Sequence, residues 1–204
     1  MQIKKYHKDL KNIGTILIDK KNSFIEDKDF LFVEKNLKKI PREHIVIGDA
    51  GEKNNVDVCR LMTDLKKPKI VNKKYSTKVL DLLNVKYLPF FKKIVNKKKL
   101  YIRRAQVNFM KKNSFVGYHL DIDSNPDYLY AVVLQLGSKF TGGDYVVHKN
   151  KNKKNIFKPK YKSVILSDCK IPHEVTKVRS GERVSFVFFL SGHYKNNKRK
   201  DNAN

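Results

Sequence analysis

Apolar and polar positions alternate through the second half of the chain, which is the pattern of β-strands that bury one face. From Tyr101 onward, turn signals that contain Gly, Pro, Asn or Ser separate short segments of this kind. Short strands at such spacing are typical of an antiparallel sandwich or barrel. Seven strands are predicted, over residues 102–110, 115–121, 129–136, 144–148, 163–167, 173–178 and 183–190.

The first half of the chain has a different pattern, in which two segments repeat apolar side chains at helical spacing. The first predicted helix covers residues 27–40 and ends before Pro41. The second begins with Ser76 as its N-cap and carries an apolar face until Pro89, which is expected to kink or break it. Shorter elements are predicted at residues 13–19 (strand), 44–48 (strand) and 49–55 (polar turn).

The length of 204 residues suits one domain with a hydrophobic core of its own. Residues 1–194 are expected to form that domain, an α+β to mainly β fold. Within it, residues 1–100 supply supporting helices and strands, and residues 101–194 supply the β-strand core. Residues 195–204 are a basic tail with almost no apolar side chains, which is expected to be disordered.

The chain has two cysteines, Cys59 and Cys169, so a disulfide framework is not expected and a reducing compartment is the default. The first ten residues lack the apolar segment of a secretory signal. No apolar run approaches the ~20 residues that a membrane span needs. The expected location is therefore the cytoplasm, with no membrane partner.

The formal charge of +25 comes mainly from lysine. Seven of the 45 basic residues are Arg, whereas proteins that read phosphate groups favour Arg for its two-pronged hydrogen bonding. The lysines are spread along the whole chain, which favours a solvated surface over a nucleic-acid site. Nucleic acid is therefore an allowed partner but not a favoured one. The lysine-rich run at residues 149–155 is predicted to be a solvated hairpin tip.

Three residues of the second half form the ligand pattern of a metal site. His119 and Asp121 lie two apart at the end of a predicted strand, so both side chains face the same side. His173 follows Pro172 at the start of a later strand and is the natural third ligand. Two histidines and one carboxylate on one face of an octahedron leave three positions open, the arrangement of non-haem Fe(II) oxygenases.

Other residues are rivals for these ligand positions, although they rank lower. His148 ends a predicted strand beside the lysine-rich run, and His193 follows the last strand. Asp123 is the rival of Asp121, but its neighbours up to Pro126 indicate that it belongs to a turn.

Arg183 opens a strongly apolar predicted strand, where a guanidinium is unfavourable unless it binds an anion. A carboxylate is a suitable partner, because Arg binds carboxylates through two parallel hydrogen bonds. Ser185 lies on the same face and could donate its hydroxyl to the same anion. The alternative is an ordinary salt bridge from Arg183 to Glu182 or Glu174.

Together these motifs resemble, in order and spacing, those of the Fe(II)/2-oxoglutarate-dependent dioxygenases, nearest to the prolyl 4-hydroxylase-like branch. The matching residues are 119–121, 172–175 and 181–185. The resemblance implies a double-stranded β-helix, or jelly-roll, core with the first-half helices packed outside it. It implies that His119, Asp121 and His173 bind Fe(II) and are catalytic, and that Arg183 and Ser185 bind 2-oxoglutarate. It also implies O2 as a co-substrate and ascorbate in a supporting role.

Polar residues on other predicted strands are candidates for the co-substrate pocket. Asn108 and Gln135 are assigned to cofactor binding, and Gln106 is a further candidate, each facing either the pocket or the outside. Related prolyl hydroxylases have a Tyr at the position of Phe109, which lacks the hydroxyl. Tyr118 is expected to face away from the metal.

The implied reaction couples oxidative decarboxylation of 2-oxoglutarate to succinate with hydroxylation of a second substrate. Asp121 argues against the halogenating branch, in which a small residue leaves room for halide. A peptidyl proline or another protein side chain is the first choice of substrate, because the Gly142-Gly143 turn and residues 172–175 resemble the prolyl-hydroxylase branch. A free amino acid or small metabolite is second. Nucleic-acid oxidation and a non-catalytic metal-binding jelly roll are less favoured.

Overall fold

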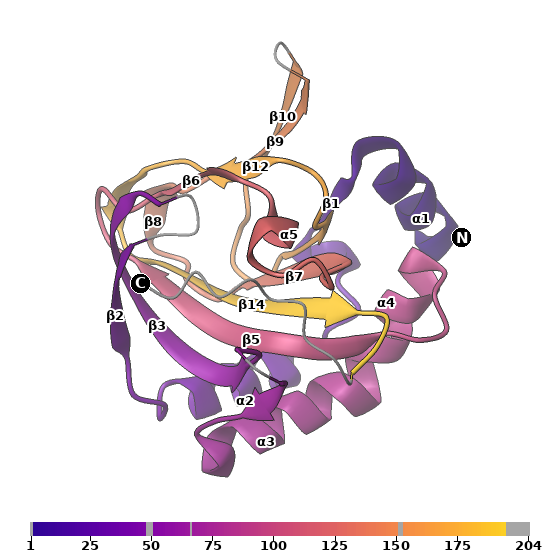
Figure 1. Cartoon of the computed structure of the whole chain (residues 1–204), viewed down its shortest axis with the longest axis horizontal. Helices are drawn as coiled ribbons and strands as arrows, with labels where there is room; N and C mark the ends of the chain where they lie inside the picture. Colours follow the sequence, from indigo (N-terminus) through magenta and orange to yellow (C-terminus); the bar gives the residue numbers. More distant parts are fainter. Residues whose placement is uncertain (1, 48–50, 66, 151–152, 195–204) are drawn as a thin grey trace.

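The computed structural model describes residues 2–47, 51–65, 67–150 and 153–194. A large and a small antiparallel sheet face each other as the two layers of a jelly roll, with helices outside the large sheet (Figure 1). This arrangement confirms the mainly β fold with supporting helices that the sequence predicts. The tail at residues 195–204 lies outside the described residues.

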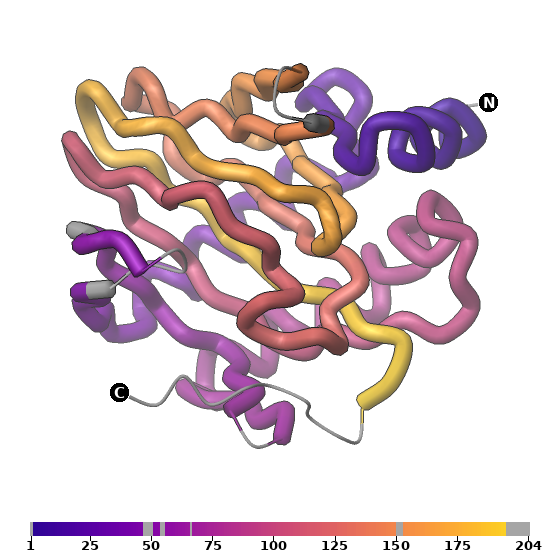
Figure 2. Tube along the Cα trace, turned by 45° about the horizontal axis from the view of Figure 1, so that its top comes forward, coloured from indigo at the N-terminus to yellow at the C-terminus, as the bar shows by residue number. Residues whose placement is uncertain are grey.

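The large sheet has the strand order β1-β11-β7-β14-β5-β3-β2, with β4 paired to β3. Segments far apart in the sequence therefore run side by side in this layer (Figure 2). The first half of the chain contributes four of the strands, so it widens the sheet more than predicted. The strands are β1 (Thr15–Ile18), β2 (Glu43–Ile47), β3 (Lys53–Thr63), β4 (Lys69–Ile70), β5 (Tyr101–Met110), β7 (Tyr130–Gln135), β11 (Val164–Asp168) and β14 (Arg183–Ser191).

The small sheet has the strand order β10-β9-β12-β6. Strands β13 and β8 form a separate two-stranded sheet. The β9–β10 hairpin projects beyond the rest of the fold (Figure 1), and the predicted lysine-rich hairpin tip belongs to it. Residues 151–152 of that run lie outside the described residues. The strands are β6 (Val116–His119), β8 (Phe140–Gly142), β9 (Tyr145–Asn150), β10 (Lys153–Phe157), β12 (His173–Val175) and β13 (Val178–Gly181).

Helices cover the outer face of the large sheet. In the central strand β14, Phe186, Phe188 and Leu190 are buried in the core that the helices share. Val187 and Phe189 alternate to the other face and line the interior between the two sheets. Within the described ranges, no helix is long and apolar enough to cross a membrane. The helices are α1 (Gln2–Ile13), η1 (Lys20–Asn22), α2 (Asp27–Leu37), α3 (Lys73–Leu82), the π-helical η2 (Leu83–Tyr87), α4 (Leu88–Val95) and α5 (Asp121–Ser124).

Strand β3 and helix α1 are the longest elements of the first half that were not predicted; the short β4 and η1 were not predicted either. Strand β3 begins at Lys53, so the predicted polar turn at residues 49–55 is wrong at its end. Val56 and Val58 of this strand are buried in the core between the two sheets. The first residues of the strand are polar and do not alternate with apolar ones, so the sequence does not indicate where the strand begins. Helix α1 is mostly polar, and Leu10 is its one buried residue, so its apolar face is too sparse to stand out in the sequence.

The helical region from α3 to α4 differs from the prediction at the start of α3 and just before Pro89. Asn72, with φ 51°, precedes α3, and Ser76 lies buried inside the helix, so the prediction of Ser76 as N-cap is wrong. The expected interruption at Pro89 takes the form of the π-helical turn η2, which ends at Tyr87. Pro89 then lies in the first turn of α4, where its missing N–H removes no helical hydrogen bond.

Candidate metal and co-substrate site

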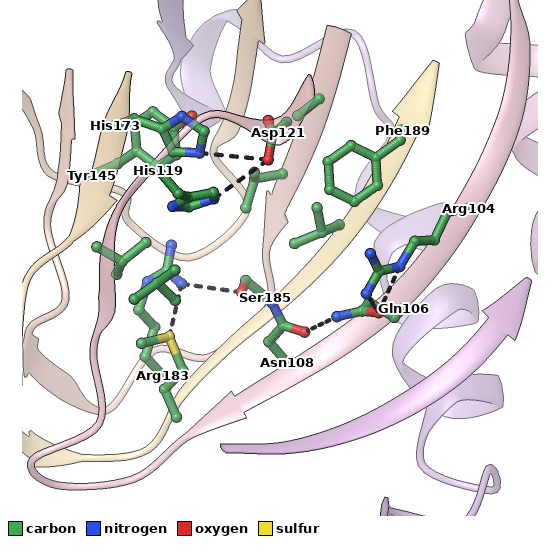
Figure 3. A pocket seen from close by; sticks show the side chains of 16 residues that line it. Arg104, Gln106, Asn108, His119, Asp121, Tyr145, His173, Arg183, Ser185 and Phe189 are labelled. Atoms are coloured by element: carbon green, nitrogen blue, oxygen red, sulfur yellow. Dashed lines mark hydrogen bonds and ion pairs between the residues drawn. The ribbon is translucent and has the colours of Figure 1, made fainter. Parts of the chain in front are cut away.

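Two strands and one short helix bring three ligand side chains together. His119 at the end of β6 and His173 at the start of β12 are direct partners in the antiparallel register, with ring centroids 4.4 Å apart. Asp121 lies just beyond them as the first residue of α5, so the strand predicted to reach residue 121 ends earlier. The ligand atoms of the three residues lie within 4.8 Å of one another (Figure 3).

Both histidines present the same ring nitrogen to this cluster. Nδ1 of His119 lies 2.8 Å from the carbonyl oxygen of Gly117, and Nδ1 of His173 lies 3.0 Å from that of Ile171. A carbonyl oxygen only accepts, so each Nδ1–H donates and each Nε2 keeps its lone pair. The two Nε2 atoms lie 3.5 and 3.7 Å from Oδ1 of Asp121, so the lone pairs and the carboxylate converge on one point.

Asp121 is buried, and its second oxygen, Oδ2, has no hydrogen-bond partner among the described residues. Burial raises the pKa of Asp121, yet the neighbouring His173 and His119 outweigh it and hold that pKa below its usual value. A buried carboxylate with an unsatisfied oxygen is unfavourable unless a cation lies beside it. The cluster therefore fits a divalent cation held by two nitrogens and one oxygen on one side.

Arg183 lies in the same cavity with most of its hydrogen-bonding capacity unused. The side chain is 2% exposed, and its Nη1 donates to Oγ of Ser185 at 3.1 Å. Its Nε and Nη2 have no partner in the part of the chain that the structure describes. Burial lowers the pKa of Arg183 to about 10, so the guanidinium is still charged at neutral pH, and no described carboxylate forms a salt bridge with it.

The salt bridge considered as the alternative for Arg183 does not form. Glu182 instead accepts from Arg42 at 3.1 Å, and Glu174 contacts His148 at 3.1 Å and Lys154 at 3.8 Å. Neither of these two carboxylates therefore uses the Nε and Nη2 donors of Arg183, which have the geometry to bind a carboxylate.

Tyr145 also lines this cavity, although the sequence pattern did not predict it as a site residue. Its ring stacks on that of His173, with centroids 4.9 Å apart and planes at 24°. The hydroxyl is buried and has no hydrogen-bond partner among the described residues. Burial raises the pKa of Tyr145 well above its ordinary value, and the charge of Asp121 raises it further, so the hydroxyl is a donor at neutral pH.

Comparisons with known proteins agree with this site. A sequence model of the 2OG-Fe(II) oxygenase superfamily matches residues 105–191. An oxidoreductase of the 2OG-Fe(II) oxygenase family from Burkholderia pseudomallei, solved by crystallography, is 36% identical, with a TM-score of 0.91 over 97% of this chain and 94% of that chain. The chain belongs to the 2OG-Fe(II) oxygenase family. It is therefore an oxygenase that uses Fe(II), 2-oxoglutarate and O2.

Other solved structures share the fold at lower identity. A Pseudomonas putida prolyl-4-hydroxylase has a TM-score of 0.66 at 12% identity, covering 94% of this chain and 99% of that chain. The epimerase SnoN from nogalamycin biosynthesis has a TM-score of 0.68 at 7% identity, covering 93% of this chain and 80% of that chain. No curated protein sequence matches the chain. The fold thus hosts different reactions and does not identify the substrate of this 2OG-Fe(II) oxygenase.

The residues present fit the cofactors of the family. The His119, Asp121 and His173 cluster offers the donor types that suit iron, and it lies on one side of the cavity. The unsatisfied donors of Arg183 and Tyr145 offer three hydrogen bonds to a carboxylate of 2-oxoglutarate. Both partners of the expected ligand set therefore find complementary groups in this oxygenase.

The remaining predicted pocket residues divide between the cavity and other places. Asn108 and Gln106 line the cavity. Gln135 does not line it, because its amide donates to the carbonyls of Val184 at 2.8 Å and Gly137 at 3.2 Å. Phe109 faces the opposite side of β5, where the Arg42 guanidinium lies 3.6 Å from its ring centroid, so it does not occupy the place of a pocket tyrosine.

The rival ligands lie outside the cluster. His148 directs Nε2 to Glu174 at 3.1 Å, and His193 directs Nε2 to Asp127 at 3.1 Å. Tyr118 is 58% exposed and packs edge-on against His148, so it faces away from the metal cluster as predicted.

Proposed function

We propose that the protein is an Fe(II)- and 2-oxoglutarate-dependent hydroxylase in which His119, Asp121 and His173 hold the iron. The observation that carries this proposal is that a preformed ligand cluster and an unpaired buried guanidinium share one cavity. When bound, the cofactors supply the oxidising chemistry, in which decarboxylation of 2-oxoglutarate to succinate and CO2 is coupled to insertion of oxygen into a substrate C–H bond.

The chain's own residues hold and shield the co-substrate. Arg183 would bind the distal carboxylate of 2-oxoglutarate through Nε and Nη2, and the Tyr145 hydroxyl would donate to the same group. Ser185 accepts from Arg183 Nη1 and so fixes the orientation of the guanidinium. Asn108, the register partner of Ser185, extends this polar wall. Arg183, Tyr145 and Ser185 are buried, so they are poised to exclude water from the reacting centre.

Two classes of primary substrate are candidates. A protein side chain such as a peptidyl proline remains the first choice from the sequence, and the fold shared with the Pseudomonas putida prolyl-4-hydroxylase supports it. A free amino acid or small metabolite is the second candidate. A purely structural metal site is disfavoured because the donor set leaves one side of the cluster open.

The experiment is turnover of 2-oxoglutarate by the purified protein in air, with Fe(II) and ascorbate, without and with proline-containing peptides. We expect slow Fe(II)-dependent succinate formation that is lost in Asp121→Ala and kept in Asp123→Ala, the neighbouring exposed carboxylate. A peptide product heavier by one oxygen atom would establish the first substrate class. Absence of succinate from folded, iron-loaded protein with every peptide tested would contradict hydroxylation of this class.

A further inference from the structure

A second cavity, the outer cavity, lies on the helix-covered side of the large sheet, beside the C-terminal end of α2. Its walls come from the end of α2, from β5, from the segment that follows β7 and from the start of β14. Its volume is about 430 Å³, within the range of about 300–1,000 Å³ that is typical of small-molecule sites. Nothing in the proposed handling of iron and 2-oxoglutarate uses this space.

The outer cavity and the cavity of the iron ligands lie on opposite faces of the same two strands. On β5, Val107 and Phe109 line the outer cavity, whereas Asn108 between them lines the other cavity. On β14, Val184 lines the outer cavity and its neighbour Arg183 lines the other. No described residue lines both cavities, so a ligand in the outer cavity does not occupy the place of 2-oxoglutarate.

The floor of the outer cavity is apolar. Val107 and Leu136 are buried in the core beneath the helices, and Val184 packs against that core. Phe109 is 7% exposed, because the guanidinium of Arg42 lies 3.6 Å from the centroid of its ring. A ligand that fills this space needs an apolar body, since a polar body would lose its hydrogen bonds to water against these side chains.

The rim of the outer cavity carries more positive than negative charge. The basic side chains that line it are Lys38, Arg42 and Lys139, and the acidic ones are Glu34 and Glu182. Both acids already have partners, because Glu182 accepts from Arg42 at 3.1 Å and Glu34 accepts from the Tyr161 hydroxyl at 3.1 Å. Neither lysine pairs with a carboxylate in the described part of the chain. The rim therefore favours an anion.

We propose that the outer cavity binds an amphipathic carboxylic acid, with its aliphatic body on Leu136 and Val184 and its carboxylate on Arg42. Arg42 donates to Glu182 through Nη1 and its side chain is 47% exposed, so its other N–H groups are accessible to a ligand. The apolar floor selects against short dicarboxylates such as 2-oxoglutarate, and the basic rim selects against neutral lipids. The site uses no iron ligand and no donor assigned to the co-substrate, so it goes beyond the proposed function.

The test is isothermal titration calorimetry of the whole chain, loaded with Mn(II) and 2-oxoglutarate, with octanoate as the probe. The comparison ligands are 1-octanol, which lacks the charge, and acetate, which lacks the apolar body. Titrations at about 15 and 35 °C reveal binding even where the heat is small at one temperature, because burial of apolar surface makes the binding heat change with temperature. We expect saturable binding of one octanoate, at least about tenfold tighter than either comparison ligand, with the same affinity when 2-oxoglutarate is left out.

Charge variants at the rim test where the carboxylate binds. Arg42→Gln is expected to raise the Kd of octanoate about fivefold, as for a charge pair at a partly exposed site. Arg60→Gln is its matched control, since Arg60 pairs with Glu43 at 2.9 Å on β3. Lys38→Gln should weaken binding in the same direction, whereas Lys35→Gln, in the last turn of α2 and outside the cavity lining, should not.

A steric variant tests where the apolar body binds. Val184→Phe places a larger side chain in the outer cavity and is expected to abolish octanoate binding. Should this variant fail to fold, the variants of the exposed Arg42 and Lys38 still test the inference.

Three results would overturn the inference. They are octanoate binding no tighter than that of 1-octanol, wild-type affinity in both Arg42→Gln and Lys38→Gln, and loss of octanoate binding when 2-oxoglutarate is saturating, which would place the acid at Arg183. None of these results bears on the proposed function, which succinate formation tests separately.

Discussion

His119 and His173 are direct cross-strand partners in the β6–β12 pair, although most of the second half of the chain lies between them in the sequence. Each ring is fixed by a hydrogen bond to the carbonyl two residues before it. Asp121 completes the cluster from the helix that follows β6. The strand pairing and the start of α5 thus bring the three proposed ligands together, with their ligand atoms within 4.8 Å of one another.

A preformed site predicts that metal stabilises the fold. A divalent ion at about 100 times its Kd adds about 2.7 kcal/mol to the free energy of unfolding. For a chain of this size, that corresponds to a rise in Tm of roughly 5–10 °C. Thermal melting of the apoprotein with added Mn(II) or Fe(II) measures it. The rise should vanish in Asp121→Ala and persist in Asp123→Ala, and an equal rise in both variants would contradict the assigned ligand set.

Gly143 is predicted to be required for the position of Arg183. It has φ +66°, and a Cβ there would lie 2.7 Å from Cδ of Arg183. Gly143→Ala therefore adds a displacement of the guanidinium to the backbone strain of about 1–2 kcal/mol that any Ala has in the left-handed region. We expect weaker binding of 2-oxoglutarate, measured by calorimetry with an inactive divalent metal, together with a lower urea midpoint.

Gly51→Ala is the matched control for this prediction. Gly51 has a similar φ of +75°, and within the described residues no atom lies within 4 Å of a Cβ built there. It should lose stability through backbone strain alone and bind 2-oxoglutarate like the wild type. Equal affinity losses in the two variants would contradict the specific contact between Gly143 and Arg183.

The sequence predicts those site residues that lie in short, recognisable motifs. His119, Asp121, His173 and Arg183 lie in short motifs whose order and spacing are visible without knowing the fold. Their placement in one buried site agrees with that prediction, whereas their roles in binding remain proposals. Seven strands of the second half were found because their alternation is strong, whereas β8, β10 and β13 were not predicted.

The site residues that were not predicted could be found only from the strand register and from which face of each strand points into the cavity. Tyr145 follows the Gly142-Gly143 turn at the start of β9, and only the pairing of β9 with β12 brings its ring onto His173. Arg104 lies beside Arg103, which is also buried, and the sequence alone does not show which of the two side chains lines the cavity. Gln135 is the opposite case: it was predicted to line the pocket, but its side-chain amide donates to the backbone carbonyl of Val184 instead.

The segment after Asp121 is predicted to depend on a buried carboxylate. Asp64 accepts from Nδ2 of Asn125 at 2.7 Å and from the Tyr128 hydroxyl at 2.6 Å. Tyr128→Phe keeps the ring but removes one charge-assisted hydrogen bond, so it should lower the free energy of unfolding by about 1.5–3 kcal/mol. Urea denaturation measures this loss. Tyr118→Phe, at an exposed tyrosine, should change stability by less than about 0.5 kcal/mol; similar losses in both would contradict the anchoring role.

The cysteines are predicted to be inert in the folded protein. Burial raises the pKa of Cys59 to about 11, so its thiol stays protonated at pH 8, and the thiolate is the reactive form. Cys169 is fully buried as well. A coloured thiol reagent at pH 8 should therefore label neither cysteine until denaturant unfolds the chain. Rapid labelling of the native protein, at a rate near that of free cysteine, would show that one of the two sites is open.

The most direct test of the central claim is an anaerobic titration of the apoprotein with Fe(II) and 2-oxoglutarate, followed by visible absorption. We expect a metal-to-ligand charge-transfer band when both are present, and a concentration for half-formation that rises at least tenfold in Arg183→Ala, since each charge-assisted hydrogen bond contributes about 1.5–3 kcal/mol. Arg60→Ala should match the wild type. No band in folded, iron-loaded protein, or a band that forms equally well in Arg183→Ala, would contradict the assignment of the metal cluster and Arg183 to one active site.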